Sequence, residues 1–162
     1  MVSFFFKGID RLVDIVLALA LGVMLVVVAA QVWYRFVCND PLAWSEELAR
    51  YLFVWISFLG AAVGVRMKVH LGIDLLEKAL SPLMYKLMAV AVNLAIQIFL
   101  LVVIFWGVKI LGIVKFQTSA SMGISMAYPY LAVPVGAGFM LLNSLRVTWE
   151  MLRSRQPEEV HP

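Results

Sequence analysis

The chain has 162 residues, of which 64% are hydrophobic and only 14% are charged. An average soluble domain is roughly 45–50% apolar and about 25% charged, so a water-soluble fold of this size could not bury so much apolar surface, and lipid must be its solvent. The net charge of +3 comes from dispersed basic residues, which excludes a nucleic-acid-binding surface.

The first predicted membrane span covers about residues 15–34 and carries no charge. It closes with Trp33, Tyr34 and Arg35, a group typical of the membrane–water interface, so we expect these three residues to anchor the helix there. Charged residues precede the span at helical spacing, with Asp14 four residues after Asp10. They predict an extension of the same helix into water.

The second predicted span covers about residues 42–65. Its charge-free part, 51–65, has 15 residues, or about 22 Å of helix, which is shorter than a hydrocarbon core of roughly 30 Å. The segment 44–50 therefore enters the interface or is shielded by protein. Glu46 lies four residues before Arg50, so we predict that these two pair and that Glu47 stays free for a partner. Gly60 and Gly64 form a small-residue face that lets another helix approach closely.

A charged segment follows the second span. Arg66, His70, Asp74 and Lys78 recur at intervals of four and share one helical face, opposite an apolar face. This pattern predicts a short amphipathic helix over about 68–81 that lies along the membrane surface. Two interpretations stay open for its charges: an ion-pair ladder among phospholipid headgroups, or a contact with a partner protein.

The third and fourth predicted spans cover about 83–114 and 124–147. Asn93 and Gln97 lie one turn apart in the third span, so we expect both to face protein rather than lipid. Pro129 and Pro134 predict irregular first turns in the fourth span, and Trp149 is a further interface anchor. The fold class is thus an all-α integral membrane protein with four transmembrane helices and an interfacial helix between the second and third, forming one domain over 1–155 with a disordered tail over 156–162.

The basic residues predict the topology. The N-terminus, the 66–86 loop and the C-terminus hold nine Lys and Arg, and the other side holds four, which together make the 13 of the chain. The side richer in Lys and Arg is normally cytoplasmic, so we expect both termini in the cytoplasm of a bacterial inner membrane.

The sequence offers no catalytic site. An intramembrane aspartyl peptidase needs two aspartates on one side, whereas Asp40 and Asp74 are predicted on opposite sides. His70 is likewise predicted across the membrane from the serine-rich loop before the fourth span, so a serine hydrolase lacks its base. Metal ligands are too sparse for a site, and we expect neither enzymatic activity nor a cofactor.

One segment resembles a known family. The chain is similar to the small membrane (DctQ-type) subunit of tripartite ATP-independent periplasmic (TRAP) transporters, and the motif that carries the resemblance runs from Trp44 to Leu76. It consists of Trp44, Glu46, Glu47 and Arg50, then Phe53-Val54-Trp55, then Phe58-Leu59-Gly60-Ala61-Ala62, and finally Arg66, His70 and Asp74.

The resemblance implies a non-catalytic subunit that braces a much larger membrane subunit. That partner would carry the sodium and substrate sites, and a periplasmic binding protein would deliver an organic acid anion such as a dicarboxylate, a sialic acid or another sugar acid. Because the chain ends at Pro162, we expect the large subunit to be a separate chain. The residues expected at the partner interface are Trp44, Glu46, Glu47, Arg50, Gly60, Gly64, Arg66, His70 and Asp74. The alternative is a self-associating four-helix membrane protein that acts alone, as a small channel or a lipid-binding module.

Overall fold

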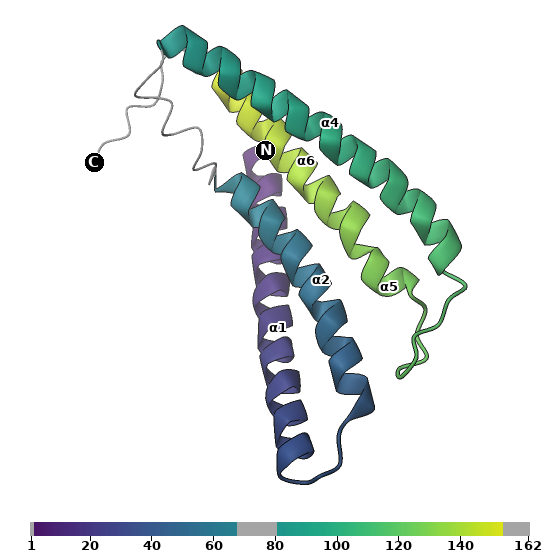
Figure 1. Ribbon diagram of the computed structural model, residues 1–162. Helices are drawn as coiled ribbons and strands as arrows, with labels where there is room; N and C mark the ends of the chain where they lie inside the picture. Colours follow the sequence, from purple (N-terminus) through teal and green to yellow (C-terminus); the bar gives the residue numbers. More distant parts are fainter. Residues whose placement is uncertain (1, 68–80, 154–162) are drawn as a thin grey trace.

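A computed structural model describes residues 2–67 and 81–153. In these two ranges the helices are α1 (Val2–Phe36), α2 (Ala43–Arg66), α4 (Pro82–Val114), α5 (Ala127–Tyr130) and α6 (Ala132–Arg153) (Figure 1). Four helical stretches in the described ranges are long and apolar enough to cross a membrane: Lys7–Phe36, Ala43–Arg66, Leu83–Val114 and Ala127–Arg153. The predicted all-α fold with four transmembrane helices is confirmed. The predicted interfacial helix, with His70 and Asp74, and the predicted tail lie outside the described residues.

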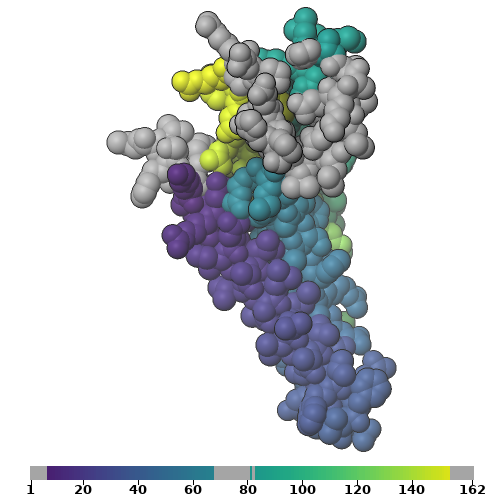
Figure 2. Space-filling model, turned by 90° about the vertical axis from the view of Figure 1, so that its left-hand side faces the viewer, coloured from purple at the N-terminus to yellow at the C-terminus, as the bar shows by residue number. Residues whose placement is uncertain are grey.

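The four long helices pack as an open row in the order α1, α2, α6, α4 (Figure 1). Among the described helices, α1 packs along α2 and reaches α6 only through the side chain of Asp10, while α4 packs on α6 and the short α5. Figure 2 shows α1 and α2 lying side by side over their length. An open row leaves the outer sides of its end helices, α1 and α4, uncovered by the other described helices.

The most buried helix of the row is α6, which contacts both α2 and α4. Within the 18-residue apolar stretch of each span, 44% of the residues are buried in the span Ala127–Arg153, compared with 11% in α2. Neighbouring helices therefore enclose α6 more than they enclose α2. The physical reason is side-chain size, because small residues of α6 let neighbours approach from two sides; Ala132, Gly136, Ala137 and Ser144 are buried.

Two glycines mark the closest helix approaches. A Cβ atom added to Gly136 would lie 2.5 Å from the Cβ of Phe58 on α2, and one added to Gly107 would lie 3.2 Å from the Cδ of Pro134. By contrast, a Cβ on Gly60 or Gly64 would meet nothing within 4 Å. The close approach of a helix predicted at Gly60 and Gly64 is thus absent within the described chain, and the small face that packs belongs to α6.

The start of the fourth span is irregular, as its two prolines predict. The four-residue helix α5 contains Pro129, and α6 begins at Ala132 with Pro134 in its first turn. Proline lacks a backbone N–H donor and its ring clashes with the preceding turn, which explains the interruption. The indole Nε1 of Trp55 donates to the carbonyl oxygen of Tyr128 at 3.2 Å and ties this irregular segment to α2.

Candidate partner interface

Glu47, near the start of α2, is bound to the loop between α4 and α5. Its Oε2 accepts hydrogen bonds from the backbone N–H groups of Ser121 at 2.9 Å and Met122 at 3.0 Å, and its Oε1 accepts one from the Tyr51 hydroxyl. The prediction that Glu47 is free for a partner is therefore wrong. The reason is that these two loop amides have no backbone acceptor, and a carboxylate on the adjacent helix satisfies both.

The loop itself is a small, ordered hairpin. The backbone N–H of Ser119 donates to the carbonyl oxygen of Ile124 at 2.8 Å, and the N–H of Met126 donates to that of Gln117 at 2.9 Å. The turn is completed by Gly123, whose φ of 65° favours glycine. Glu47 thus holds a folded loop against the start of α2.

Glu46 points to α1 instead of along its own helix. Its Oε1 lies 3.9 Å from Nη1 of Arg35 and accepts a hydrogen bond from Nε2 of Gln31 at 3.3 Å. The predicted pair with Arg50 does not form in the described structure, because the antiparallel α1 places two donors next to Glu46. The Arg35 and Glu46 side chains are 61% and 60% exposed, so their ion pair contributes at most about 1 kcal/mol.

Arg50 is exposed on α2 and no carboxylate of the described residues lies within ion-pair distance of it. Trp44, another residue of the motif, is also exposed, near the start of α2. The interface anchors predicted from the sequence are exposed as well: Trp33, Tyr34 and Arg35 end α1, and Trp149 lies on the last turns of α6.

Arg66, at the other end of α2, belongs to an ion-pair cluster that joins three helices. Its Nη2 lies 2.7 Å from Oδ1 of Asp14 and its Nη1 lies 3.6 Å from Oδ1 of Asp10, both on α1. The Nη1 of Arg146 on α6 lies 3.1 Å from Oδ2 of Asp10 and 3.4 Å from Oδ1 of Asn143. Sequence reasoning did not assign Asp10, Asp14 and Arg146 to this cluster. The available signal was two acids, four residues apart, on the side of the membrane predicted to be basic.

Polar side chains in the middle of α4 and α6 satisfy one another. Nε2 of Gln97 donates to Oγ of Ser144 at 3.3 Å and to Oγ1 of Thr148 at 2.9 Å, and Oγ of Ser144 donates to Oδ1 of Asn93 at 3.4 Å. Asn93 is 1% exposed and Gln97 is 7% exposed. Both face protein, as predicted. Because Asn93 and Gln97 are hydrogen-bonded to side chains of α6, they join α4 to α6 and do not line a polar path.

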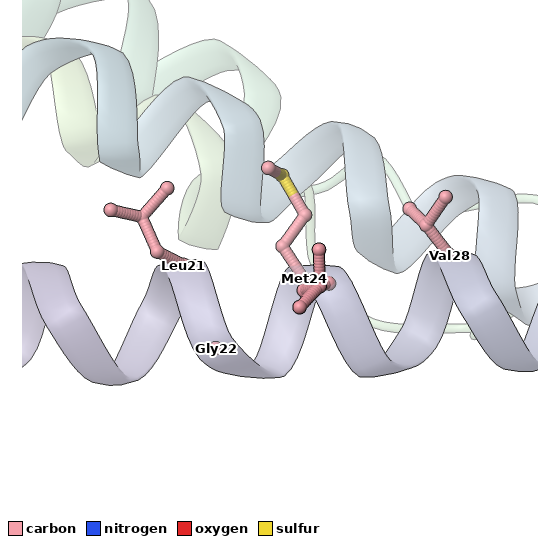
Figure 3. A pocket seen from close by; sticks show the side chains of 5 residues that line it. Leu21, Gly22, Met24 and Val28 are labelled. Atoms are coloured by element: carbon pink, nitrogen blue, oxygen red, sulfur yellow. The ribbon is translucent and has the colours of Figure 1, made fainter.

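A pocket lies on α1, formed by Leu21, Gly22, Met24, Leu25 and Val28. Figure 3 shows Leu21, Met24 and Val28 on the side of α1 that faces the neighbouring helix. All five lining residues are apolar, so this hollow offers neither a charge nor a hydrogen-bond donor to an organic anion. The features that remain as a functional site are the surfaces and ends of the helix row.

Comparison with known proteins identifies the family of this chain. The family model described as "Tripartite ATP-independent periplasmic transporters, DctQ component" matches residues 24–154. The sialic acid TRAP transporter small permease protein SiaQ of Vibrio cholerae is 25% identical over 147 residues, which cover 91% of this chain and 85% of that one. The C4-dicarboxylate TRAP transporter small permease protein DctQ of Pseudomonas aeruginosa is 33% identical over 122 residues, covering 72% of this chain and 58% of the relative.

A longer relative also matches. The sialic acid TRAP transporter permease protein SiaT of Haemophilus influenzae is 32% identical over 120 residues, which cover 74% of this chain but only 20% of that protein. The match to the family model extends over most of the four-helix row and includes the Glu47 site and both arginines of the ion-pair cluster, Arg66 and Arg146, whereas Asp10 and Asp14 precede the matched residues. The chain is therefore a multi-pass membrane protein that belongs to the DctQ-component family of tripartite ATP-independent periplasmic transporters.

Proposed function

We propose that this chain is the non-catalytic small permease subunit of a sodium-coupled TRAP transporter that takes up an organic acid anion. The proposed substrate is a dicarboxylate, a sialic acid or another sugar acid, and the names of two relatives support the first two of these. A periplasmic binding protein delivers this anion, and a large membrane subunit on a separate chain binds it together with sodium. In this proposal the small subunit itself binds neither the substrate nor the sodium ion.

The observation that carries the proposal is the open helix row. A four-helix bundle that acts alone would turn its helices around a common core, whereas here α1 and α4 each pack on one side only. The row exposes large apolar residues to its surroundings, such as Leu25 at 73%, Phe53 at 61% and Phe105 at 65%. The polar side chains of the interior are already bonded within the row. Such a layer is suited to brace a larger membrane protein and ill suited to conduct a solute.

The orientation is part of the proposal. The positive-inside rule places the termini and the Arg66 cluster in the cytoplasm, and places the α1–α2 turn and the Glu47-bound loop in the periplasm. The ordered loop at Glu47 then lies on the side from which a periplasmic binding protein would dock. The remaining surface of the row contacts phospholipids, and the membrane is the bacterial inner membrane.

Co-purification tests the proposal. A tagged copy of this chain is expressed together with its genomic neighbours, extracted in mild detergent, and analysed by mass spectrometry. The expected result is a stoichiometric large permease, with sodium-dependent uptake in proteoliposomes only when both membrane subunits and the binding protein are present. A homo-oligomer of this chain that produces its own solute flux would contradict the proposal and favour the alternative of a protein that acts alone.

A further inference from the structure

One face of α2 is left uncovered by the described part of the chain. Its exposed residues recur at helical spacing, and they are Glu46, Arg50, Phe53, Ser57 and Ala61. Open space adjoins them at Gly60 and Gly64, because a Cβ on either glycine would meet nothing within 4 Å. We call the residues from Arg50 to Gly64 on this side the outer face of α2. It lies in the middle of the row, since α2 contacts α1 on one flank and α6 on the other.

The apolar part of this face suits contact with another helix. The Ser57 hydroxyl donates to the carbonyl oxygen of Phe53 at 2.8 Å, so it is satisfied within α2. Gly60, Ala61 and Gly64 leave the backbone uncovered and let a second helix come close, which is the basis of association between helices in lipid. Disordered acyl chains make far less van der Waals contact with such a small-residue surface than a rigid helix does.

Arg50 gives the face a charge that no described residue of this chain neutralises. Gln31 on α1 meets Glu46 on α2, and the two helices are antiparallel, so Arg50 lies level with about Val27. Val27 precedes Trp33, the predicted interface anchor, by six residues, which is roughly 9 Å along the helix axis at 1.5 Å per residue. This level therefore lies within the charge-free run of α1. A lone arginine at such a depth is unfavourable and requires an anion.

The nearest carboxylates of the chain are engaged elsewhere. Glu46 turns to Arg35 and Gln31, and Glu47 is held by Tyr51 and two loop amides. In the described residues no other acidic side chain pairs with Arg50. The described part of the chain therefore supplies no anion to Arg50.

We propose that a transmembrane helix of the large subunit packs on the outer face of α2 and carries a carboxylate that pairs with Arg50. This inference rests on the proposed function and adds to it the face and the chemistry of the contact. The small residues favour a protein helix over lipid, and the Arg50 guanidinium, with its planar set of donors, fits a carboxylate in a bidentate pair. The Arg50 charge and the small residues thus lie on the same face of α2, and both favour a protein helix that carries a carboxylate.

Photo-crosslinking on the intact complex tests the face. The probe p-benzoylphenylalanine replaces Phe53 in one variant and Phe105 on α4 in the other. Both are phenylalanines on exposed surfaces, with 61% and 65% exposure, about ten residues from the corresponding ends of their helices. The expected result is a covalent product with the large subunit from the Phe53 position and little or none from Phe105. A product from Phe105 alone, or only lipid adducts at both positions, would overturn the inference.

Substitutions of Arg50 test the ion pair. Arg50→Ala is expected to reduce the large subunit retained on purification by at least about tenfold, because it leaves the partner's carboxylate without a counter-charge. Arg50→Lys is expected to restore only part of the retention, since an ammonium cannot form the bidentate pair. Arg35→Ala, which removes a more exposed arginine with a partner inside the chain, serves as the matched control and is expected to retain the partner.

The outcomes separate this inference from the proposed function. The two Arg50 variants are first compared with the wild type for their elution and thermal unfolding as isolated chains, which should not change because Arg50 has no ion-pair partner among the described residues. If the wild type brings down no large permease, the proposed function fails. If it does so and Arg50→Ala retains the permease as well as the wild type, no carboxylate of the permease pairs with Arg50, and the carboxylate pair is excluded.

Discussion

Gly136→Ala is the substitution whose effect on the fold can be worked out most directly from the structure. The added methyl group would lie 2.5 Å from the Cβ of Phe58, 3.1 Å from its carbonyl carbon and 3.2 Å from its carbonyl oxygen. Carbon atoms in favourable contact are about 3.5–4.0 Å apart, so α2 and α6 would have to separate by roughly 1 Å. Neither contact atom can rotate away, because both the Cβ and the backbone of Phe58 are fixed by the helix.

Gly138→Ala is the matched control for the size of this effect. Both glycines lie inside α6, so the gain of up to about 1 kcal/mol for alanine in a helix applies to both variants and cancels in their comparison. A Cβ on Gly138 would meet nothing within 4 Å. The difference that remains is the overpacking cost of Gly136→Ala, about 1–3 kcal/mol, and we expect the upper part of this range because two backbones must move.

Thermal unfolding in detergent measures the difference. The chain has five tryptophans, so their intrinsic fluorescence reports the loss of tertiary structure on heating. We expect Gly136→Ala to unfold at a lower temperature than the wild type, and Gly138→Ala to match or exceed it. Adding Phe58→Ala should not rescue the first variant, because the clashing Cβ and backbone remain. Equal unfolding temperatures for the two glycine variants would refute the argument that α2 and α6 touch at Gly136.

Two further predictions concern the ends of α2. Glu47→Gln removes the charge that holds two loop amides, and we expect their hydrogen exchange to become about fivefold faster, equivalent to about 1 kcal/mol; equal exchange in this variant and in the control Glu46→Gln would contradict the assignment. Asp10→Asn removes a carboxylate, 22% exposed, that two arginines share, so we expect about 1–3 kcal/mol of destabilisation, between the values for exposed and buried pairs. Asp14→Asn, at a 49% exposed carboxylate with one arginine, should lower the unfolding temperature less, and the reverse order would be inconsistent with the cluster.

The sequence predicted side-chain partners less well than helices. The spacing of Glu46 and Arg50 favours a pair within one helix, yet α1 brings Arg35 and Gln31 to Glu46 across the turn. An interaction between helical neighbours is weak, worth about 0.2–0.5 kcal/mol, so any donor supplied by another helix competes with it. Glu47 keeps one partner on its own helix, Tyr51, but its two other donors come from a loop more than 70 residues away.

The sequence by itself determined the four membrane helices and the side of α4 that faces protein. Long apolar runs form helices in lipid because every backbone polar group must be bonded within the segment. Asn93 and Gln97 marked the protein-facing side because unpaired amides are costly in hydrocarbon. Only the tertiary structure decided the order α1, α2, α6, α4 and the choice of Gly136 over Gly60 and Gly64 as the packing glycine. Lipid is as apolar as a leucine side chain, so the sequence of an apolar helix face does not indicate whether that face contacts protein or membrane.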